Sequence, residues 1–185
     1  MEHWDLYKPI REKTGETIPF AGKLPEDRIR MVVHVAIINS QDKMLIQKRQ
    51  SGILVGPNLW DLSAGGSGRA GDSSQMAIER ELKEELGLEH SFEKEMPILT
   101  TYSPWVFDDI YAIRKDFQLT DLKLQEEEVQ AVAWASLEEI FQLMDEGKFM
   151  GYGRPLIELL FARLRWREKM KKKDYSFKPK DKEYI

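Results

Sequence analysis

The sequence feature that most constrains the fold is a glycine-rich stretch that leads directly into a helical pattern. The stretch SAGGSGRAGD occupies residues 63–72, and its glycines allow positive φ and close approach of backbone groups to a ligand or ion. Asp72 or Ser73 fits the N-cap of a helix over 73–86, and Gly87 fits its C-terminal end. The junction between loop and helix is therefore a candidate ligand site.

The predicted helix carries an apolar stripe and an acidic stripe side by side. At about 100° per residue, the apolar stripe contains Ile78, Leu82 and Leu86, and the acidic stripe contains Glu81, Glu84 and Glu85. Like charges at these spacings repel, and the repulsion is stronger at the edge of a buried face. Arg80 can neutralise only part of this charge. A divalent cation would neutralise the rest, because ions such as Mg²⁺ prefer oxygen ligands and retain positions for water and substrate phosphates.

Residues 66–88 resemble the Nudix box, whose pattern is G-x5-E-x7-R-E-U-x-E-E-x-G-U, with U an aliphatic residue. Gly66 opens the pattern, and RELKEELGL at residues 80–88 completes it. Asp72 stands where the family has Glu, so its shorter side chain reaches less far toward Arg80 or an ion. The resemblance implies the α/β (α+β) class and a Nudix-type α/β/α sandwich, in which a mixed β-sheet lies between helices.

The resemblance also implies a metal-dependent hydrolase that cleaves a diphosphate linkage in a nucleoside diphosphate derivative, with Mg²⁺ or Mn²⁺ as the cofactor. By position in the box, the metal ligands are Glu81, Glu84 and Glu85. Arg80 is expected to orient one of these glutamates. The backbone around Gly65 and Gly66 is expected to contact the ion or the substrate.

The general base is not fixed by the box. Glu81 is one candidate, and the acidic run Glu126–Glu128, of which Glu128 directly precedes an expected strand, supplies another. An ordinary charged turn is the alternative reading of that run. Arg49, at the end of another expected strand, is a candidate phosphate contact, with a surface arginine as the equal alternative.

Apolar runs on both sides of the box predict the rest of the sheet. MVVHVAIIN at 31–39 is nearly unbroken and rich in β-branched residues, which indicates a buried strand with His34 as a partnered core histidine. Residues 43–49 are its expected hairpin partner. Further strands are expected at 59–64, 97–102, 108–117 and 129–134, and helices at 136–146 and 152–172. The predicted organisation is an N-terminal extension at 1–30, a Nudix domain at 31–165 and a basic tail at 166–185.

Charge and composition narrow the class of partner. The net charge of −4 argues against a nucleic-acid-binding module, and a chain of 185 residues is long enough for one domain with its own core. The start lacks the order of a signal peptide, and no stretch is long enough to span a bilayer. We therefore expect a cytoplasmic protein that acts on a small molecule and binds neither membrane nor nucleic acid specifically. A homodimer is compatible with the resemblance, with the extension as one candidate contact.

Two other functions stay open. RQSGILVGPNLWDLSAGG, before the box, also looks like the branch that contains isopentenyl diphosphate isomerase. That enzyme needs a cysteine acid/base, whereas this chain has no cysteine and no Lys or Arg between Arg49 and Arg69 to hold a diphosphate. A non-catalytic binding module with the same fold is the third hypothesis. The three intact glutamates argue against it, because binding alone does not require their repulsion to be tolerated.

Overall fold

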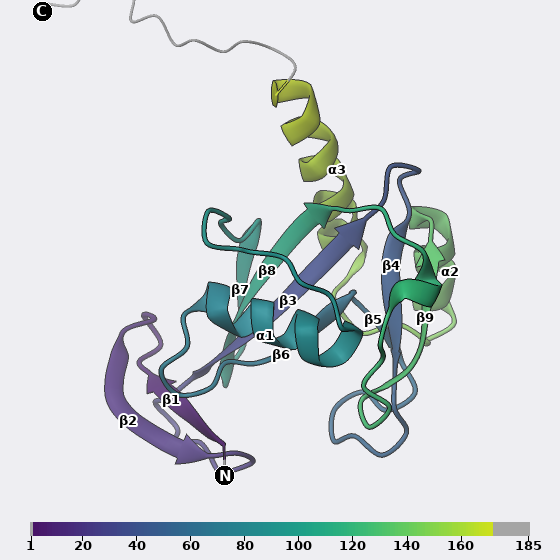
Figure 1. Cartoon of the computed structure of the whole chain (residues 1–185). Coiled ribbons are helices and arrows are strands. Elements are labelled where there is room, and N and C mark those ends of the chain that lie inside the picture. Colours follow the sequence, from purple (N-terminus) through teal and green to yellow (C-terminus); the bar gives the residue numbers. More distant parts are fainter. Residues whose placement is uncertain (1, 172–185) are drawn as a thin grey trace, which may run out of the picture.

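The structure is a computed structural model that describes residues 2–171 of the chain. Within these residues, a mixed sheet lies between one helix on one face and two on the other (Figure 1). The sheet strands are β3 (Arg30–Ile38), β4 (Met44–Arg49), β5 (Trp60–Asp61), β6 (Ala64–Ser67), β7 (Leu99–Tyr102), β8 (Val106–Arg114) and β9 (Val129–Ala135). The helices are α1 (Ser74–Leu86), α2 (Leu137–Asp145) and α3 (Arg154–Lys171), with a 3₁₀ turn at Leu119–Asp121. This is the predicted α/β/α sandwich.

Strand β3 lies at the centre of the sheet and is buried on both faces. It pairs in parallel with β8 and antiparallel with β6, and the strand order is β5-β4-β3-β8-β7, with β9 on β4. Val33, Val35 and Ile37 belong to the core under α1. Ala36 and Ile38 belong to the core under α2 and α3. Burial on both faces explains the unbroken apolar run, because alternation is expected only where one face meets water.

The expected hairpin of β3 and β4 opens after a single pair. Ile38 lies opposite Met44. Before Ile38 in β3 and after Met44 in β4, the Ser63 side chain bonds to both strands. The Ser63 hydroxyl accepts a hydrogen bond from the Ile37 amide at 2.7 Å and donates one to the Leu45 carbonyl at 2.6 Å. The Ser63 side chain thus replaces a direct backbone hydrogen bond between β3 and β4, and β6 begins at the next residue.

Residues 65–67, expected in a glycine-rich loop after a strand at 59–64, belong to strand β6, so the loop prediction was wrong there. Gly65 lies opposite His34 and Gly66 opposite Val33 in the antiparallel pairing. Glycine favours loops in isolated sequence, but the ladder bonds use only backbone groups. A Cβ on Gly65 would clash with the His34 imidazole, so the absent side chain is what permits this close pairing.

The N-terminal extension contains a second, two-stranded sheet of β1 (His3–Tyr7) and β2 (Lys13–Pro19). This hairpin lies beside the entrance to α1 in Figure 1. Tyr7 and Ile29 exchange backbone hydrogen bonds of 2.8 and 2.9 Å, which join the hairpin to the chain just before β3. The extension therefore contacts its own domain, and dimerisation through it stays a prediction.

None of the helices in residues 2–171 is long and apolar enough to cross a membrane. The basic tail was predicted at 166–185, but residues up to Lys171 belong to α3. The remainder of that predicted tail, 172–185, lies outside the described residues.

Candidate active site

Helix α1 is defined at both ends by local signals. The Ser73 hydroxyl caps it by accepting a hydrogen bond from the Met76 amide at 3.1 Å, so Ser73 and not Asp72 is the N-cap. Gly87 adopts a left-handed φ of 67° and closes the last turn. The apolar stripe packs on the sheet through Ile78, Leu82 and Leu86, none of which is exposed. The predicted helix is confirmed.

Two of the three glutamates turn toward β6. Glu81 and Glu85 are only 8% and 2% exposed. A Cβ on Gly66 would lie 2.5 Å from the Glu81 carboxyl carbon, so the glycine leaves the space that this carboxylate fills. The Glu85 carboxylate accepts hydrogen bonds of 3.0 Å from the Gly65 amide and from the side-chain amide of Gln47. The glycine-rich strand and the acidic stripe are therefore in direct contact.

Burial changes the charge state of this pair. Burial raises the pKa of Glu81 to about 7, against the lowering effect of the Arg80 guanidinium. Burial and the neighbouring charge of Glu81 raise the pKa of Glu85 to about 8, although the Gly65 amide and Gln47 favour its ionised form. Ionising both carboxylates near neutral pH is therefore costly unless a positive charge joins them.

Arg80 supplies part of that positive charge. Its guanidinium donates to Glu81 at 2.7 Å, to Glu84 at 3.2 Å and to the Ser67 carbonyl at 2.8 Å. It also reaches the Asp72 carboxylate at 3.2 Å, and that carboxylate accepts the Arg69 amide at 2.9 Å. The aspartate thus reaches Arg80 despite its shorter side chain.

The donor set fits a hard divalent cation. Every candidate ligand is an oxygen, from carboxylates or from the β6 backbone, which is the chemistry that Mg²⁺ and Mn²⁺ prefer. Within residues 2–171, no three His, Asp or Glu side chains already converge as a metal cluster. Glu84 instead contacts Arg80 and Arg69. The pKa values of Glu81 and Glu85 are raised, and a cation bound by both carboxylates would stabilise their ionised forms.

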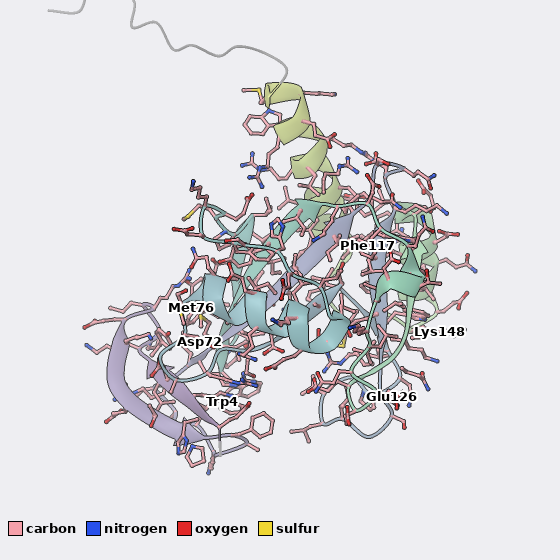
Figure 2. All side chains as sticks on the ribbon, viewed as in Figure 1. Trp4, Asp72, Met76, Phe117, Glu126 and Lys148 are labelled. Atoms are coloured by element: carbon pink, nitrogen blue, oxygen red, sulfur yellow. The ribbon has the colours of Figure 1, made fainter. Side chains whose placement is uncertain are left out.

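The segment that carries Glu128 is bonded to the last turn of α1, the helix of the acidic stripe. The segment before β9 is tied to the end of α1, where the Gln125 amide donates to the Glu85 carbonyl at 3.0 Å. Glu128 is exposed, and its charge contributes to raising the pKa of both Glu81 and Glu85. Glu126, labelled in Figure 2, lies on the same segment, and its carbonyl accepts from Gln50. The role of Glu128 as a general base stays a prediction.

Arg49 is engaged within the chain. Its guanidinium donates to the Asp61 carboxylate at 3.1 Å and to the Val55 carbonyl at 3.0 Å, and its side chain is 18% exposed. A phosphate would have to share it with these partners. The structure shows Arg49 partly buried and paired, and both the phosphate contact and the surface-arginine alternative stay open.

His34, which lies opposite Gly65 in the pairing of β3 with β6, belongs to a cluster of polar side chains that the sequence predicted only in part. The His34 ring nitrogen Nδ1 lies 2.9 Å from both oxygens of Asp108. Burial disfavours the imidazolium, but the Asp108 carboxylate outweighs this and raises the pKa of His34 to about 9. Beside it, the Tyr152 hydroxyl donates to Asp61 at 2.7 Å. His34 is the partnered histidine predicted, but sequence alone did not show that its partner is a carboxylate.

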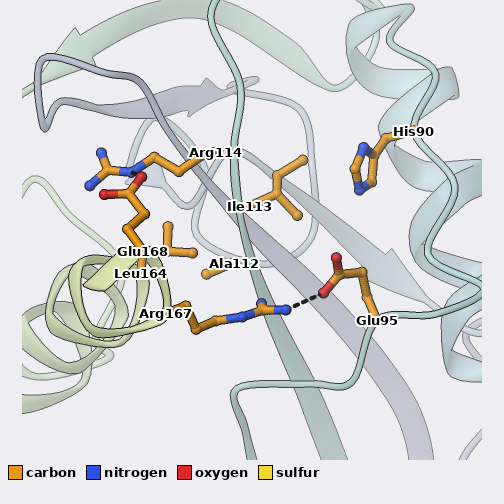
Figure 3. Close-up of a pocket in the computed structure, with 8 residues that line it drawn as sticks. All are labelled: His90, Glu95, Ala112, Ile113, Arg114, Leu164, Arg167 and Glu168. Atoms are coloured by element: carbon orange, nitrogen blue, oxygen red, sulfur yellow. Dashed lines mark hydrogen bonds and ion pairs between the residues drawn. The ribbon is translucent and has the colours of Figure 1, made fainter. Parts of the chain in front are cut away.

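A separate cavity of about 240 Å³ lies between α3, the end of β8 and the segment after α1 (Figure 3). Arg167 and Glu95 form an ion pair of 2.8 Å at this cavity, and Arg114 pairs with Glu168 at 2.8 Å. Its lining includes none of the predicted site residues. The charged groups that line it are already paired, so we place the candidate active site at α1 and β6.

The fold and the site together define an α/β/α sandwich whose glycine-rich strand holds buried glutamates of one helix. The family model described as NUDIX domain matches residues 28–157, so the chain belongs to the Nudix hydrolase family. An uncharacterized Nudix hydrolase of Listeria monocytogenes is 42% identical over 152 residues, which cover 82% of this chain and 90% of that protein. The family assignment from the box is confirmed.

Solved structures share the fold. A Deinococcus radiodurans protein, DR0079, superposes with a TM-score of 0.71 at 24% identity, covering 86% of this chain and 99% of that one. The NUDIX domain of Shewanella oneidensis NrtR, solved with ADP ribose, has a TM-score of 0.52 at 20% identity, covering 80% and 93%. At these identities the likeness shows the fold alone. Nudix hydrolases generally use divalent metal ions, and the chain is a member of that class of enzyme.

Proposed function

We propose that this chain hydrolyses a diphosphate linkage in a nucleoside diphosphate derivative, with Mg²⁺ or Mn²⁺ held by Glu81, Glu84 and Glu85. The observation that carries the proposal is the buried pair of Glu81 and Glu85 against Gly65 and Gly66. Such a pair is unfavourable in a purely structural role, because two desolvated carboxylates repel. It is favourable where a cation completes the site.

Each residue then has a distinct task. A divalent cation, when bound, neutralises diphosphate oxygens and lowers the pKa of a coordinated water. Arg80 holds Glu81 and Glu84 in place through its hydrogen bonds of 2.7 and 3.2 Å. The Gly65 amide fixes the Glu85 carboxylate at 3.0 Å. Glu128, which is exposed and whose charge contributes to raising the pKa of Glu81, accepts the proton of the attacking water, with Glu81 as the alternative acceptor.

The substrate is proposed by class. The Shewanella oneidensis NUDIX domain that binds ADP ribose supports a nucleotide-derived diphosphate as the ligand. The test is a panel of nucleoside diphosphate derivatives and dinucleoside polyphosphates, each with Mg²⁺ and with Mn²⁺, with products separated by chromatography. Metal-dependent release of a nucleoside monophosphate supports the proposal. Ligand binding without turnover across the panel would instead favour a binding module.

The residue test uses Glu85→Gln, which keeps the shape of the side chain and removes its charge. Glu158→Gln, at an exposed position of α3, is the matched control. We expect turnover to fall roughly 100-fold or more for Glu85→Gln, because a lost ligand weakens both metal binding and charge stabilisation. The control is expected to keep the wild-type rate. Full turnover in Glu85→Gln would reject the metal site.

We also propose that the protein acts in the cytoplasm on small molecules, as a monomer or homodimer, without specific binding to nucleic acid or membrane. The net charge of −4 supports the exclusion of nucleic acid. Light scattering on the full chain gives its oligomeric state, and cell fractionation gives its location. Sequence-selective DNA or RNA binding at physiological salt would contradict the proposal.

A further inference from the structure

The N-terminal hairpin contacts the loop between β6 and α1. The Ala70 amide donates to the His3 carbonyl at 2.7 Å, and the Gly71 amide donates to the Asp5 carboxylate at 2.9 Å. Lys13, from the second strand of the hairpin, donates to Asp5 at 2.7 Å. Although burial opposes ionisation, Lys13 and Gly71 together lower the pKa of Asp5. A charged carboxylate of β1 therefore fixes the backbone of this loop.

Two charged side chains of the same loop, Arg69 and Asp72, contact charged residues of α1 at the candidate metal site. Arg69 contacts Glu2 of the extension at 2.5 Å and Glu84 of α1 at 3.1 Å. Asp72, at the end of the loop, accepts the Arg69 amide at 2.9 Å and the Arg80 guanidinium at 3.2 Å. Two loop residues, Arg69 and Asp72, are therefore bonded to Glu84 and Arg80 of α1.

A second series of contacts connects the hairpin to Arg80 through residues of β3 and β6. The Trp4 ring lies 4.1 Å from the Arg30 guanidinium, measured from the ring centroid. Arg30 donates to the Ser67 hydroxyl at 2.7 Å, and the Ser67 carbonyl accepts from Arg80 at 2.8 Å. In Figure 2, Trp4 on the hairpin and Asp72 at the entrance to α1 lie on the same side of the molecule. The contacts through the loop and the contacts through β3 and β6 thus both reach Arg80.

The far end of the hairpin is also anchored. Arg11, in the turn between β1 and β2, has a φ of 65° and forms an ion pair with Asp109, which is fully buried on β8. Its guanidinium also lies 4.6 Å from the Phe107 ring centroid. The hairpin is thus fixed both to the sheet and to the loop, although it precedes the segment 28–157 that matches the family model.

We propose that the hairpin β1–β2 is a positioning element of the metal site, with Asp5 as its principal positioning residue. By fixing the Gly71 amide, Asp5 holds the loop from which Arg69 and Asp72 orient Glu84 and Arg80. This inference rests on the proposed metal site. Partners behind the ligands of a metal site commonly change metal affinity roughly 10-fold to 100-fold when removed.

The test compares Asp5→Ala, Asp5→Asn and the control Glu12→Ala in the full chain. Glu12 belongs to the turn of the same hairpin, and within residues 2–171 its carboxylate pairs with Lys8 at 3.1 Å and with no residue of the loop. The dissociation constant for Mn²⁺ is measured by calorimetry well below the lowest melting temperature, where every variant is folded. The melting temperature of each variant without metal is also measured.

We expect Asp5→Ala to raise the Mn²⁺ dissociation constant roughly 10-fold and Glu12→Ala to leave it unchanged. Asp5→Asn should be closer to wild type, because its amide oxygen can still accept the Gly71 N–H bond. An unchanged dissociation constant for Asp5→Ala, with only a lower melting temperature, overturns the positioning role and leaves the metal site intact. A wild type that binds no Mn²⁺ rejects the metal site and, with it, the role of the hairpin.

Discussion

Gln47 of β4 donates a hydrogen bond of 3.0 Å to the buried carboxylate of Glu85 on α1. Gln47 is 2% exposed, so this amide has no solvent to bond with instead. The contact connects the sheet to the acidic stripe and favours the ionised form of Glu85. In the proposed metal site, this contact orients the Glu85 carboxylate before an ion binds.

Replacing Gln47 by Leu tests that orientation. We expect turnover to fall roughly 10-fold, because Glu85 loses a donor that favours its charged form. The pH at which activity rises to half its maximum should also move upward, since the pKa of Glu85 increases without the donor. The measurement is a pH–rate profile with saturating Mn²⁺. A profile that superposes on that of the wild type contradicts the proposed role of Gln47.

Gly66→Ala tests the contact between β6 and Glu81. The new Cβ would meet the Glu81 carboxyl carbon at 2.5 Å, so the carboxylate must move. We expect a loss of stability of about 1–3 kcal/mol and a larger relative loss of activity. Gly52→Ala is the control, because no atom lies within 4 Å of a Cβ at that position. Denaturant unfolding and turnover are measured for both, and equal behaviour of the two variants would argue against the contact.

Asp72→Glu tests the departure from the family pattern. Asp72 already reaches both Arg80 and the Arg69 amide, so we expect restoring the longer acid to change turnover less than about threefold. Asp72→Ala frees Arg80 from one of its partners and should reduce turnover roughly 10-fold. The turnover of both variants and of the wild type is measured by steady-state kinetics at saturating Mg²⁺. A large gain for Asp72→Glu would show that the shorter side chain limits the enzyme.

The parts of this fold that were predictable from sequence depend on local signals. Helix α1 follows from its Ser73 cap, its apolar stripe and Gly87, all within one short segment. β3 follows from its unbroken apolar run. The family assignment follows from the fixed spacing of the box, whereas the metal ligands that the box implies stay a proposal. None of these needs knowledge of which strands pair.

The parts that were not predicted depend on pairing between distant segments. Strand β6 is a strand only because β3 lies beside it, and its glycines suggest a loop in isolation. His34 and Asp108 meet because β3 and β8 run parallel in one register, which neither strand encodes alone. The hairpin β1–β2 is interrupted by glycine and proline in the sequence, and it is held by contacts such as Arg11 with Asp109. Long-range partners of this kind override local propensity.

The pH dependence of stability tests the electrostatics of the buried pair. An unfolded glutamate has a pKa of about 4.3, whereas the pKa values of Glu81 and Glu85 are about 7 and about 8 in the fold. Between these values the native state binds more protons than the unfolded state, so metal-free stability should fall as the pH rises from 5 to about 8. His34, with a pKa of about 9, adds a loss of the same sign between its unfolded pKa of about 6.5 and 9.

The substitution Glu85→Gln separates the charge of this side chain from its shape. Glu85→Gln removes one like charge from the pair, so its melting temperature without metal should equal or exceed that of the wild type at pH 8 and depend less on pH. Mn²⁺ should raise the melting temperature of the wild type, because a ligand that binds only the native state stabilises it. The same addition should raise that of the variant much less. A structural role for Glu85 requires the reverse, with a variant less stable than wild type in the absence of metal and an equal response to Mn²⁺.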